Sequence, residues 1–121
     1  NWKGEPADPK SIKTFKSCIL DWNKRNKGRH KIMKEFYTEL IKLRKNEKAR
    51  ALVSGNLLII KKKSQWAVFN FGNKQENYPA NTSKKILDSA AQKWGGPGVA
   101  KTLKRKADLT IQPRSFVILK R

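Results

Sequence analysis

Two carboxylates are the first candidates for chemistry in this 121-residue chain. Glu35 and Glu39 are four residues apart, so a helix would place both on one face, where one protonated and one ionised group could act as acid and base. Lysines stand at helical spacing from each of them, Lys31 before Glu35 and Lys42 after Glu39. Such spacing favours solvated ion pairs. We therefore interpret the two glutamates as surface residues and not as a catalytic dyad.

The remaining residues that could catalyse a reaction or bind a metal are few. Glu5 and Asp8 lie in a Gly-Glu-x-x-Asp-Pro segment, where turn or capping hydrogen bonds are expected. His30 is the single histidine and Cys18 the single cysteine, so neither a zinc pattern nor a supported Cys–His pair can be assembled. We expect His30 to be exposed near a helix start and Cys18 to be a small, half-buried apolar residue. The sequence thus predicts no catalytic residue, no metal ligand and no cofactor site.

A glycine-rich segment, Lys93-Trp94-Gly95-Gly96-Pro97-Gly98, is a candidate binding loop. A phosphate loop would need Gly-Lys-Ser/Thr between a strand and a helix, and that context is missing, so a surface turn is expected. Trp94 is predicted to pack in the core. The alternative is that Trp94 contacts sugar, because aromatic rings stack on pyranose faces.

The charge of the chain indicates an anionic partner first. There are 29 Lys and Arg residues against 9 Asp and Glu, a formal net charge of +20. Basic clusters that could neutralise phosphates occur at residues 24–29, 61–63 and 101–106. They fall in a linker and two loops, where lysines commonly maintain solubility and protect sheet edges. We interpret them as a solubilising surface, and a free-standing nucleic-acid-binding module remains the alternative.

The aromatic strand Trp66–Phe71 bears on that alternative, because its spacing resembles an RNA-recognition strand. That motif needs a basic residue and a glycine before its first aromatic residue, whereas Ser64 and Gln65 stand there. The strand is also apolar at nearly every position, which suits burial better than base stacking. The match to an RNA-binding strand is therefore poor.

One helix is predicted to position the residues of the first half of the chain. Residues 1–28 contain two prolines and two glycines and no sustained period, which indicates an irregular or partly 3₁₀ segment lying over something larger. From Arg29 to about Lys45 the apolar residues follow helical spacing, with Ile32, Phe36, Leu40 and Leu43 on one stripe and Met33, Tyr37 and Ile41 beside it.

Short strands are predicted for the second half. They cover residues 51–53, 57–61, 65–71, 85–89, 108–111 and 115–120, with one edge strand possible within 74–84. The 65–71 strand is apolar on both faces and is expected to be central, and Pro113 should hold the turn between the last two strands. The predicted fold class is α+β, mainly β: an irregular segment and one helix lead into an antiparallel sandwich of roughly six to eight strands.

Several motifs, taken in order, carry a family resemblance. They are Gly4-Glu5-Pro6-Ala7-Asp8-Pro9, Thr14-Phe15, Leu20-Asp21-Trp22, Phe36-Tyr37-x-x-Leu40-Ile41-x-Leu43-Arg44, Trp66-Ala67-Val68-Phe69-Asn70-Phe71, Ile86-Leu87-Asp88-Ser89 with Trp94-Gly95-Gly96, and the closing stretch from Leu109 to Leu119. Together they resemble the carboxy-terminal end of maltooligosyltrehalose trehalohydrolases, a family of the α-amylase clan of glycoside hydrolases (family 13). The high positive charge is the main departure from that family.

The resemblance implies a division of the chain and a role for each part. Residues 1–47 would be the end of the catalytic barrel, and residues 48–121 a sandwich of the α-amylase carboxy-terminal type. The catalytic carboxylates would lie in barrel segments before Asn1, so this piece is expected to be inactive by itself. The parent would hydrolyse the α-1,4 bond next to the trehalose unit. Expected partners are the barrel of the same chain and α-glucan, the latter through Trp94.

Two further expectations concern the cellular compartment of the chain and its relation to membranes. A lone cysteine and the lack of an apolar run of about 20 residues indicate a cytoplasmic chain without a membrane span.

A third function class is an interaction module, in which the helix docks partly on the β domain and partly on the barrel. A fully buried helix stripe without an exposed apolar patch would contradict that hypothesis.

Overall fold

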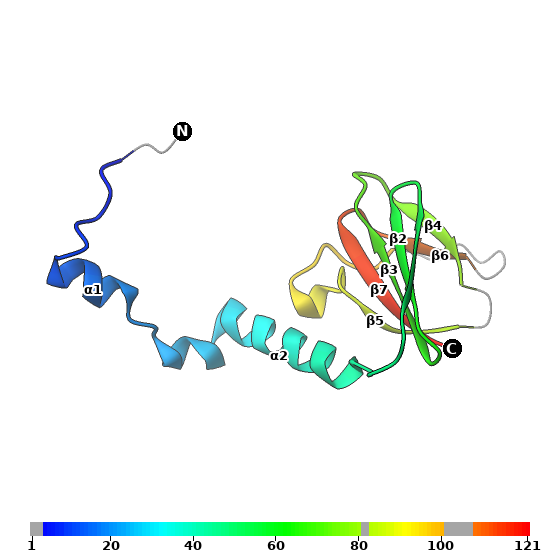
Figure 1. Cartoon of the computed structure of the whole chain (residues 1–121), viewed down its shortest axis with the longest axis horizontal. Coiled ribbons are helices and arrows are strands. Elements are labelled where there is room, and N and C mark those ends of the chain that lie inside the picture. Colours follow the sequence, from blue (N-terminus) through cyan, green and yellow to red (C-terminus); the bar gives the residue numbers. More distant parts are fainter. Residues whose placement is uncertain (1–3, 81–82, 101–107) are drawn as a thin grey trace.

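The computed structural model describes residues 4–80, 83–100 and 108–121. In these residues, helix α1 (Ile12–Cys18), the 3₁₀ helix η1 (Trp22–Asn26) and helix α2 (Gly28–Leu43) precede seven strands (Figure 1). The strands are β1 (Arg50–Ser54), β2 (Leu57–Lys61), β3 (Gln65–Asn70), β4 (Glu76–Pro79), β5 (Lys84–Asp88), β6 (Asp108–Ile111) and β7 (Ser115–Lys120), with the short 3₁₀ helix η2 (Gln92–Trp94) after β5. The α+β, mainly β class is as predicted.

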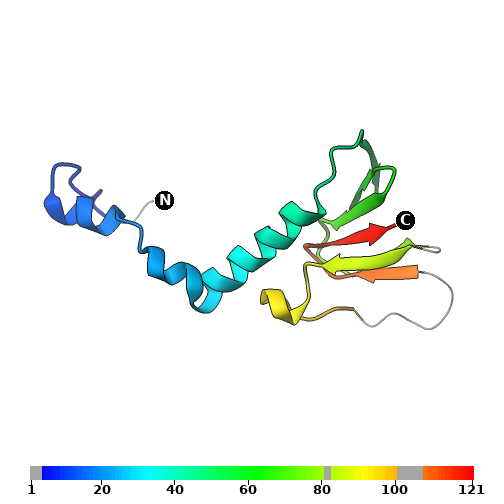
Figure 2. The same ribbon diagram turned by 90° about the horizontal axis from the view of Figure 1, so that it is seen from below.

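The amino-terminal part contains a helix that the sequence pattern did not predict. Ser11 is the N-cap of helix α1, and its Oγ accepts a hydrogen bond from the Lys13 N–H at 3.2 Å. Seven residues are too few to establish a helical period, so only the 3₁₀ part of the expectation is confirmed, by η1. The two views agree that α1 lies away from the sheets (Figures 1 and 2). Cys18 is consequently exposed, and the expectation of a half-buried thiol is wrong.

Helix α2 agrees with the predicted range to within two residues. Its ion pairs are the expected ones: Lys42 Nζ lies 2.8 Å from Glu39 Oε1, and Lys31 Nζ lies 3.9 Å from Glu35 Oε1. His30 is in the first turn and exposed, as expected.

The strands form two antiparallel sheets. One has the order β1-β2-β3-β7-β5, and the other consists of β4 and β6. Strand β3 is central in the larger sheet, as predicted. The smaller sheet pairs Tyr78 with Leu109, across a separation that no local pattern specifies.

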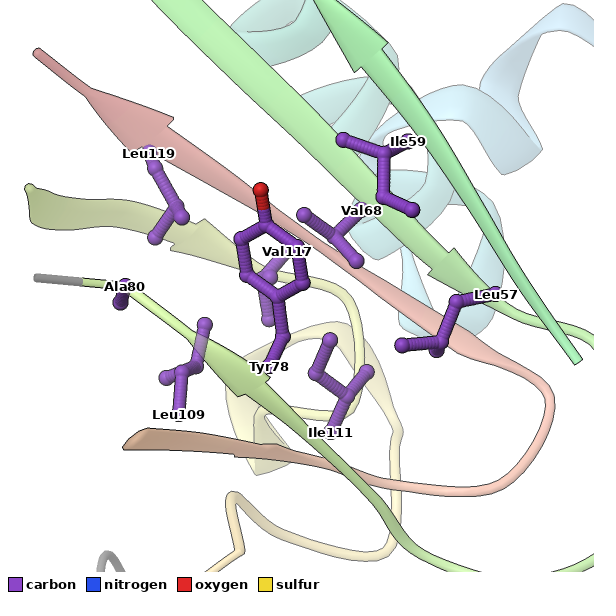
Figure 3. Packing of buried hydrophobic residues seen from close by; sticks show 9 residues of the cluster. All are labelled: Leu57, Ile59, Val68, Tyr78, Ala80, Leu109, Ile111, Val117 and Leu119. Carbon is purple, nitrogen blue, oxygen red and sulfur yellow. The ribbon is translucent and has the colours of Figure 1, made fainter. Parts of the chain in front are cut away.

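One cluster of buried side chains joins the two sheets (Figure 3). Its members are Leu57, Ile59, Val68, Tyr78, Ala80, Leu109, Ile111, Val117 and Leu119. Burial of each larger apolar side chain contributes about 1.5–3 kcal/mol. A two-stranded sheet is marginal alone, so β4 and β6 depend on this contact with the larger sheet. Burial also raises the pKa of the Tyr78 hydroxyl.

Asn70, at the end of β3, is the buried polar residue that connects the strands. Its Nδ2 donates to the carbonyl oxygens of Lys74, Ile111 and Gln112 at 2.8, 3.2 and 3.1 Å, and its Oδ1 accepts from the Gly72 N–H at 2.8 Å. With 1% exposure, the amide has no access to water as an alternative partner. This one side chain therefore holds the end of β3 against the β6–β7 turn.

The connection from α2 to β1 is bonded to the β2–β3 turn. Lys62 Nζ donates to the Lys45 carbonyl at 2.6 Å, and the Ser64 N–H donates to Glu47 Oε2 at 3.0 Å. The predicted boundary between residues 47 and 48 falls inside this connection. These bonds orient α2 relative to the β strands.

Candidate interaction site

A groove of about 690 Å³ lies between α2 and the edge of the β part. We call it the aromatic groove, because four aromatic side chains from three elements line it together with two arginines. These six residues are Arg29, Phe36, Tyr37, Trp94, Arg114 and Phe116.

The aromatic rings form a continuous series of contacts from the sheet to the helix. Phe69 stacks on Phe71 and on Phe116, with centroids 6.2 and 5.1 Å apart. Phe36 of α2 then contacts Phe116 at 6.1 Å and Trp94 at 5.2 Å. Each such pair contributes about 0.5–1.5 kcal/mol beyond area burial. The half-buried stripe of α2 is thereby attached to the β part.

A tight turn after β5 positions Trp94. Asp88 is buried; its Oδ1 accepts from the Ala90 N–H at 3.0 Å and its Oδ2 pairs with Lys85 Nζ at 2.8 Å. Gly96 passes so close to Ala90 that a Cβ there would lie 2.4 Å from the Ala90 carbonyl oxygen. The predicted surface turn therefore needs glycine for steric reasons.

Trp94 itself is half-buried, with its ring against Phe36. Lys93 Nζ lies over the ring, 4.5 Å from its centroid, so a sugar stacking on that face would have to displace the ammonium group. Among the described residues, Trp94 Nε1 is buried and has no hydrogen-bond acceptor.

Of the two arginines of the groove, Arg29 belongs to the basic cluster predicted at residues 24–29, whereas the sequence did not single out Arg114. Arg114 is in the β6–β7 turn with φ of 50°, a left-handed conformation that L residues rarely adopt. Its Nε and Nη2 donate to Asn73 Oδ1 at 3.1 and 2.9 Å. Arg29 comes from the first turn of α2. The turn at Pro113 was predicted, but nothing local indicates that its arginine lines a groove together with α2.

The carboxylates predicted to be surface residues are placed as expected. The side chains of Glu35 and Glu39 are 52% and 42% exposed, and each pairs with its lysine. The hydrogen bond and the charge of Lys42 hold the pKa of Glu39 below 4.5. Asp8 Oδ1 accepts from the Lys10 N–H at 2.9 Å, a local turn. Within the described ranges, His, Cys, Asp and Glu residues form no group of three that could hold a metal ion.

The basic clusters differ in how free their charges are. In the 61–63 cluster, Lys61 lies over the Trp66 ring at 4.5 Å and Lys62 bonds to the Lys45 carbonyl, so two of three lysines make intramolecular contacts. The 24–29 cluster spans η1 and the start of α2 and is exposed. The 101–106 cluster lies outside the described residues.

Large apolar side chains are exposed along the amino-terminal part. On α2, Met33, Tyr37 and Ile41 are 56%, 58% and 69% exposed, whereas Ile32, Phe36 and Leu40 are half-buried. Ile12, Phe15, Ile19, Leu20 and Trp22 are exposed as well. The result that would have contradicted the interaction hypothesis, a fully buried helix stripe without an apolar patch, is not found. In the part of the chain that the structure describes, no helix is both long and apolar enough to cross a membrane.

The aromatic groove and the exposed apolar side chains between Ile12 and Ile41 are thus the candidate site. No protein-family model matches this chain, and no curated protein matches it.

Proposed function

We propose that this chain is the non-catalytic carboxy-terminal part of a glycoside hydrolase of the maltooligosyltrehalose trehalohydrolase family. Residues 1–47 complete the catalytic barrel, and residues 48–121 form a sandwich of the α-amylase carboxy-terminal type. The parent enzyme hydrolyses the α-1,4 bond next to the trehalose unit of a maltooligosyltrehalose in the cytoplasm. The role of this part is to steady the barrel.

The observation that carries the proposal is the exposure of apolar side chains before the β part. Of the twelve exposed large apolar residues in the described ranges, eight lie between Ile12 and Ile41. So many exposed apolar side chains in one segment favour an interaction with a partner. By the order of the family motifs, the same segment would be the end of a barrel. A barrel as partner would therefore explain both the motif order and the exposed apolar side chains.

The larger sheet supports the same proposal with its outer face. Val53, Leu58, Phe69 and Phe116 stand opposite one another in register across β1, β2, β3 and β7. The core cluster uses the other face, which includes Ile59, Val68 and Val117. A sheet that is apolar on both faces needs cover on both. Helix α2 supplies some of that cover through Phe36, and the barrel is proposed to supply the rest.

The decisive experiment is to sequence the source reading frame upstream of the Asn1 codon. A continuous frame encoding an α-amylase-type barrel is expected. The full-length protein should then release trehalose from a maltooligosyltrehalose, and the 121-residue chain should not. A start codon directly before Asn1 would overturn the proposal.

The second candidate, a nucleic-acid-binding module, is favoured by one observation, the exposed basic cluster at residues 24–29. It predicts that the chain binds a single-stranded oligonucleotide with an affinity that falls steeply with salt. Replacing Lys24, Arg25 and Lys27 with glutamine should abolish that binding. Weak binding that is indifferent to these changes would reject this candidate.

A further inference from the structure

The arginines of the aromatic groove are not neutralised within the described residues. The three ion pairs found there all use lysine: Lys31, Lys42 and Lys85. Arg29 and Arg114 line the groove from α2 and from the β6–β7 turn, and no Asp or Glu lines it with them. Within the described residues, two arginines therefore line one groove without an acidic residue beside them.

Within the described residues, the Arg114 side chain bonds only to an uncharged amide. Asn73 Oδ1 holds its Nε and Nη2, which leaves Nη1 unused within the described residues, and the amide adds no negative charge. The backbone at this position has φ of 50°, which Asn or Gly would adopt more easily. The left-handed conformation of Arg114 costs conformational free energy. Within the described residues, no ion pair between Arg114 and a carboxylate offsets that cost.

The walls beside the arginines are aromatic, but their ring faces are largely taken. Phe116 is in contact with Phe69 and Phe36, and Lys93 lies over Trp94. Tyr37, at 58% exposure, is the most exposed of the four aromatic residues that line the groove. Few faces are free to stack on a pyranose or a base, whereas an aliphatic side chain can pack against ring edges. The N–H groups of the two arginines can only donate hydrogen bonds. A planar guanidinium group can bind a carboxylate in bidentate geometry.

We propose that the aromatic groove receives a carboxylate-bearing protein segment of the catalytic domain. An Asp or Glu of that segment pairs with Arg114 and Arg29, and an adjacent apolar side chain packs against Phe36 and Tyr37. The excess of positive charge on this chain makes an acidic partner surface complementary. This inference rests on the proposed function, and it adds the chemistry by which the two parts recognise each other.

A peptide titration tests the recognition chemistry with the chain alone. The probe is acetyl-Asp-Leu-Asp-amide, its matched neutral control is acetyl-Asn-Leu-Asn-amide, and NMR follows the arginine Nε–H and Trp94 indole signals. We expect saturable shifts of Arg29 and Arg114 with the acidic peptide only, and affinity about tenfold weaker in Arg114→Asn. Lys84→Gln removes an exposed positive charge on β5, outside the lining of the groove, and should leave the affinity unchanged. Shifts spread evenly over the lysine surface, or equal shifts with both peptides, would overturn the proposal.

The same titration with maltoheptaose and with an eight-residue oligothymidylate separates the other ligand classes. Saturable shifts of Tyr37 and Trp94 with maltoheptaose, without an effect of the acidic peptide, would make the groove a glucan site. Saturable shifts with the oligothymidylate alone would make it a nucleic-acid site. Either result would overturn the carboxylate proposal.

A comparison of two proteins separates this inference from the proposed function. In the 121-residue chain, Arg114→Asn relieves the backbone conformation and should leave Tm unchanged or raise it. In the full-length protein from the source frame, the same change should lower Tm by about 5 °C. A barrel in the frame with no such drop would overturn the inference and leave the proposed function standing. A frame without a barrel would overturn both.

Discussion

Gln65 Nε2 donates to the carbonyl oxygen of Leu43 at 2.8 Å, so the first residue of β3 is bonded to the last residue of α2. That carbonyl is one of those left without an intrahelical partner at a helix end, and the side chain supplies its donor. With the Lys62–Lys45 and Ser64–Glu47 contacts, this bond sets the direction in which α2 leaves the β part. The position of the aromatic groove follows from that direction.

Replacing Gln65 with methionine tests this link. The side chain keeps its length but loses the donor, so we expect the free energy of unfolding to fall by about 1 kcal/mol and amide exchange in the last turn of α2 to accelerate. Gln75→Met is the control, because Gln75 bonds to Gln112 on the exposed surface. Equal effects of the two changes on α2 would show that Gln65 does not orient the helix.

Asn70→Asp should be the most destabilising of the changes considered. It replaces an amide donor with an acceptor facing three carbonyl oxygens in a buried site, and we expect a loss of about 2–4 kcal/mol in urea unfolding at neutral pH. Asn77→Asp is matched to it: that side chain is exposed and its Oδ1 still accepts from the Thr110 hydroxyl, now 2.9 Å away. A loss at Asn70 no larger than the one at Asn77 would contradict the network described for the end of β3.

Gly96→Ala should disturb the turn that carries Trp94. The added Cβ would meet the Ala90 carbonyl oxygen, so we expect a loss of about 1–3 kcal/mol and a shift in Trp94 fluorescence. Gly55→Ala is the control that separates crowding from backbone conformation. Gly55 has φ of 57° and open space around it, so alanine there should lose about 1 kcal/mol of stability through the left-handed conformation alone. A Gly96 variant with unchanged Trp94 fluorescence would mean that the turn does not fix the ring.

Trp94→Phe and Trp94→Ala separate the contribution of the Trp94 ring to stability from that of its N–H group. Phenylalanine keeps the contact with Phe36 and removes the buried donor that lacks an acceptor, so the free energy of unfolding should change by less than about 0.5 kcal/mol. Alanine removes the ring and should cost about 2 kcal/mol or more. Thermal and urea unfolding of both variants provide the measurement. Similar losses in both would indicate that the indole N–H has a partner in solution.

Acid should weaken the contact between Glu47 and Ser64. Hydrogen bonding by Ser64 holds the pKa of Glu47 below 4.5. The Ser64 N–H donates to Glu47 Oε2 at 3.0 Å, whereas the Ser64 hydroxyl has no hydrogen-bond partner among the described residues, so the N–H accounts for the lower pKa. A carboxyl group whose pKa is lower in the folded state contributes stability above 4.5, and that contribution is lost as the pH falls through the folded pKa.

Glu47→Gln provides the readout for that prediction. At pH 7 the variant should melt below the wild type, and the difference should shrink as the pH is lowered below 4.5. A difference in Tm that stays constant from pH 7 to about pH 3 would show that the carboxylate charge does not stabilise the fold.

The sequence by itself determined the elements whose signals are local. The 3.6-residue period of Ile32, Phe36 and Leu40 specifies α2, and Pro113 marks the turn between β6 and β7 because its ring fixes φ. The apolar residues on both faces of β3 predicted its central place in the sheet. The lysine pairs of Glu35 and Glu39 followed from helical spacing alone.

The tertiary structure alone decided which distant residues meet. Seven residues are too short for a period, so α1 was missed, and Cys18 is exposed because its helix packs against no sheet. The pairing of Tyr78 with Leu109, the bonds of Asn70 to the β6–β7 turn and the presence of Arg29 and Arg114 in one groove all join segments far apart in the chain. Local patterns record the backbone preferences and the burial of single elements. They carry no information on contacts that form only when separate elements pack, and the candidate site is made of such contacts.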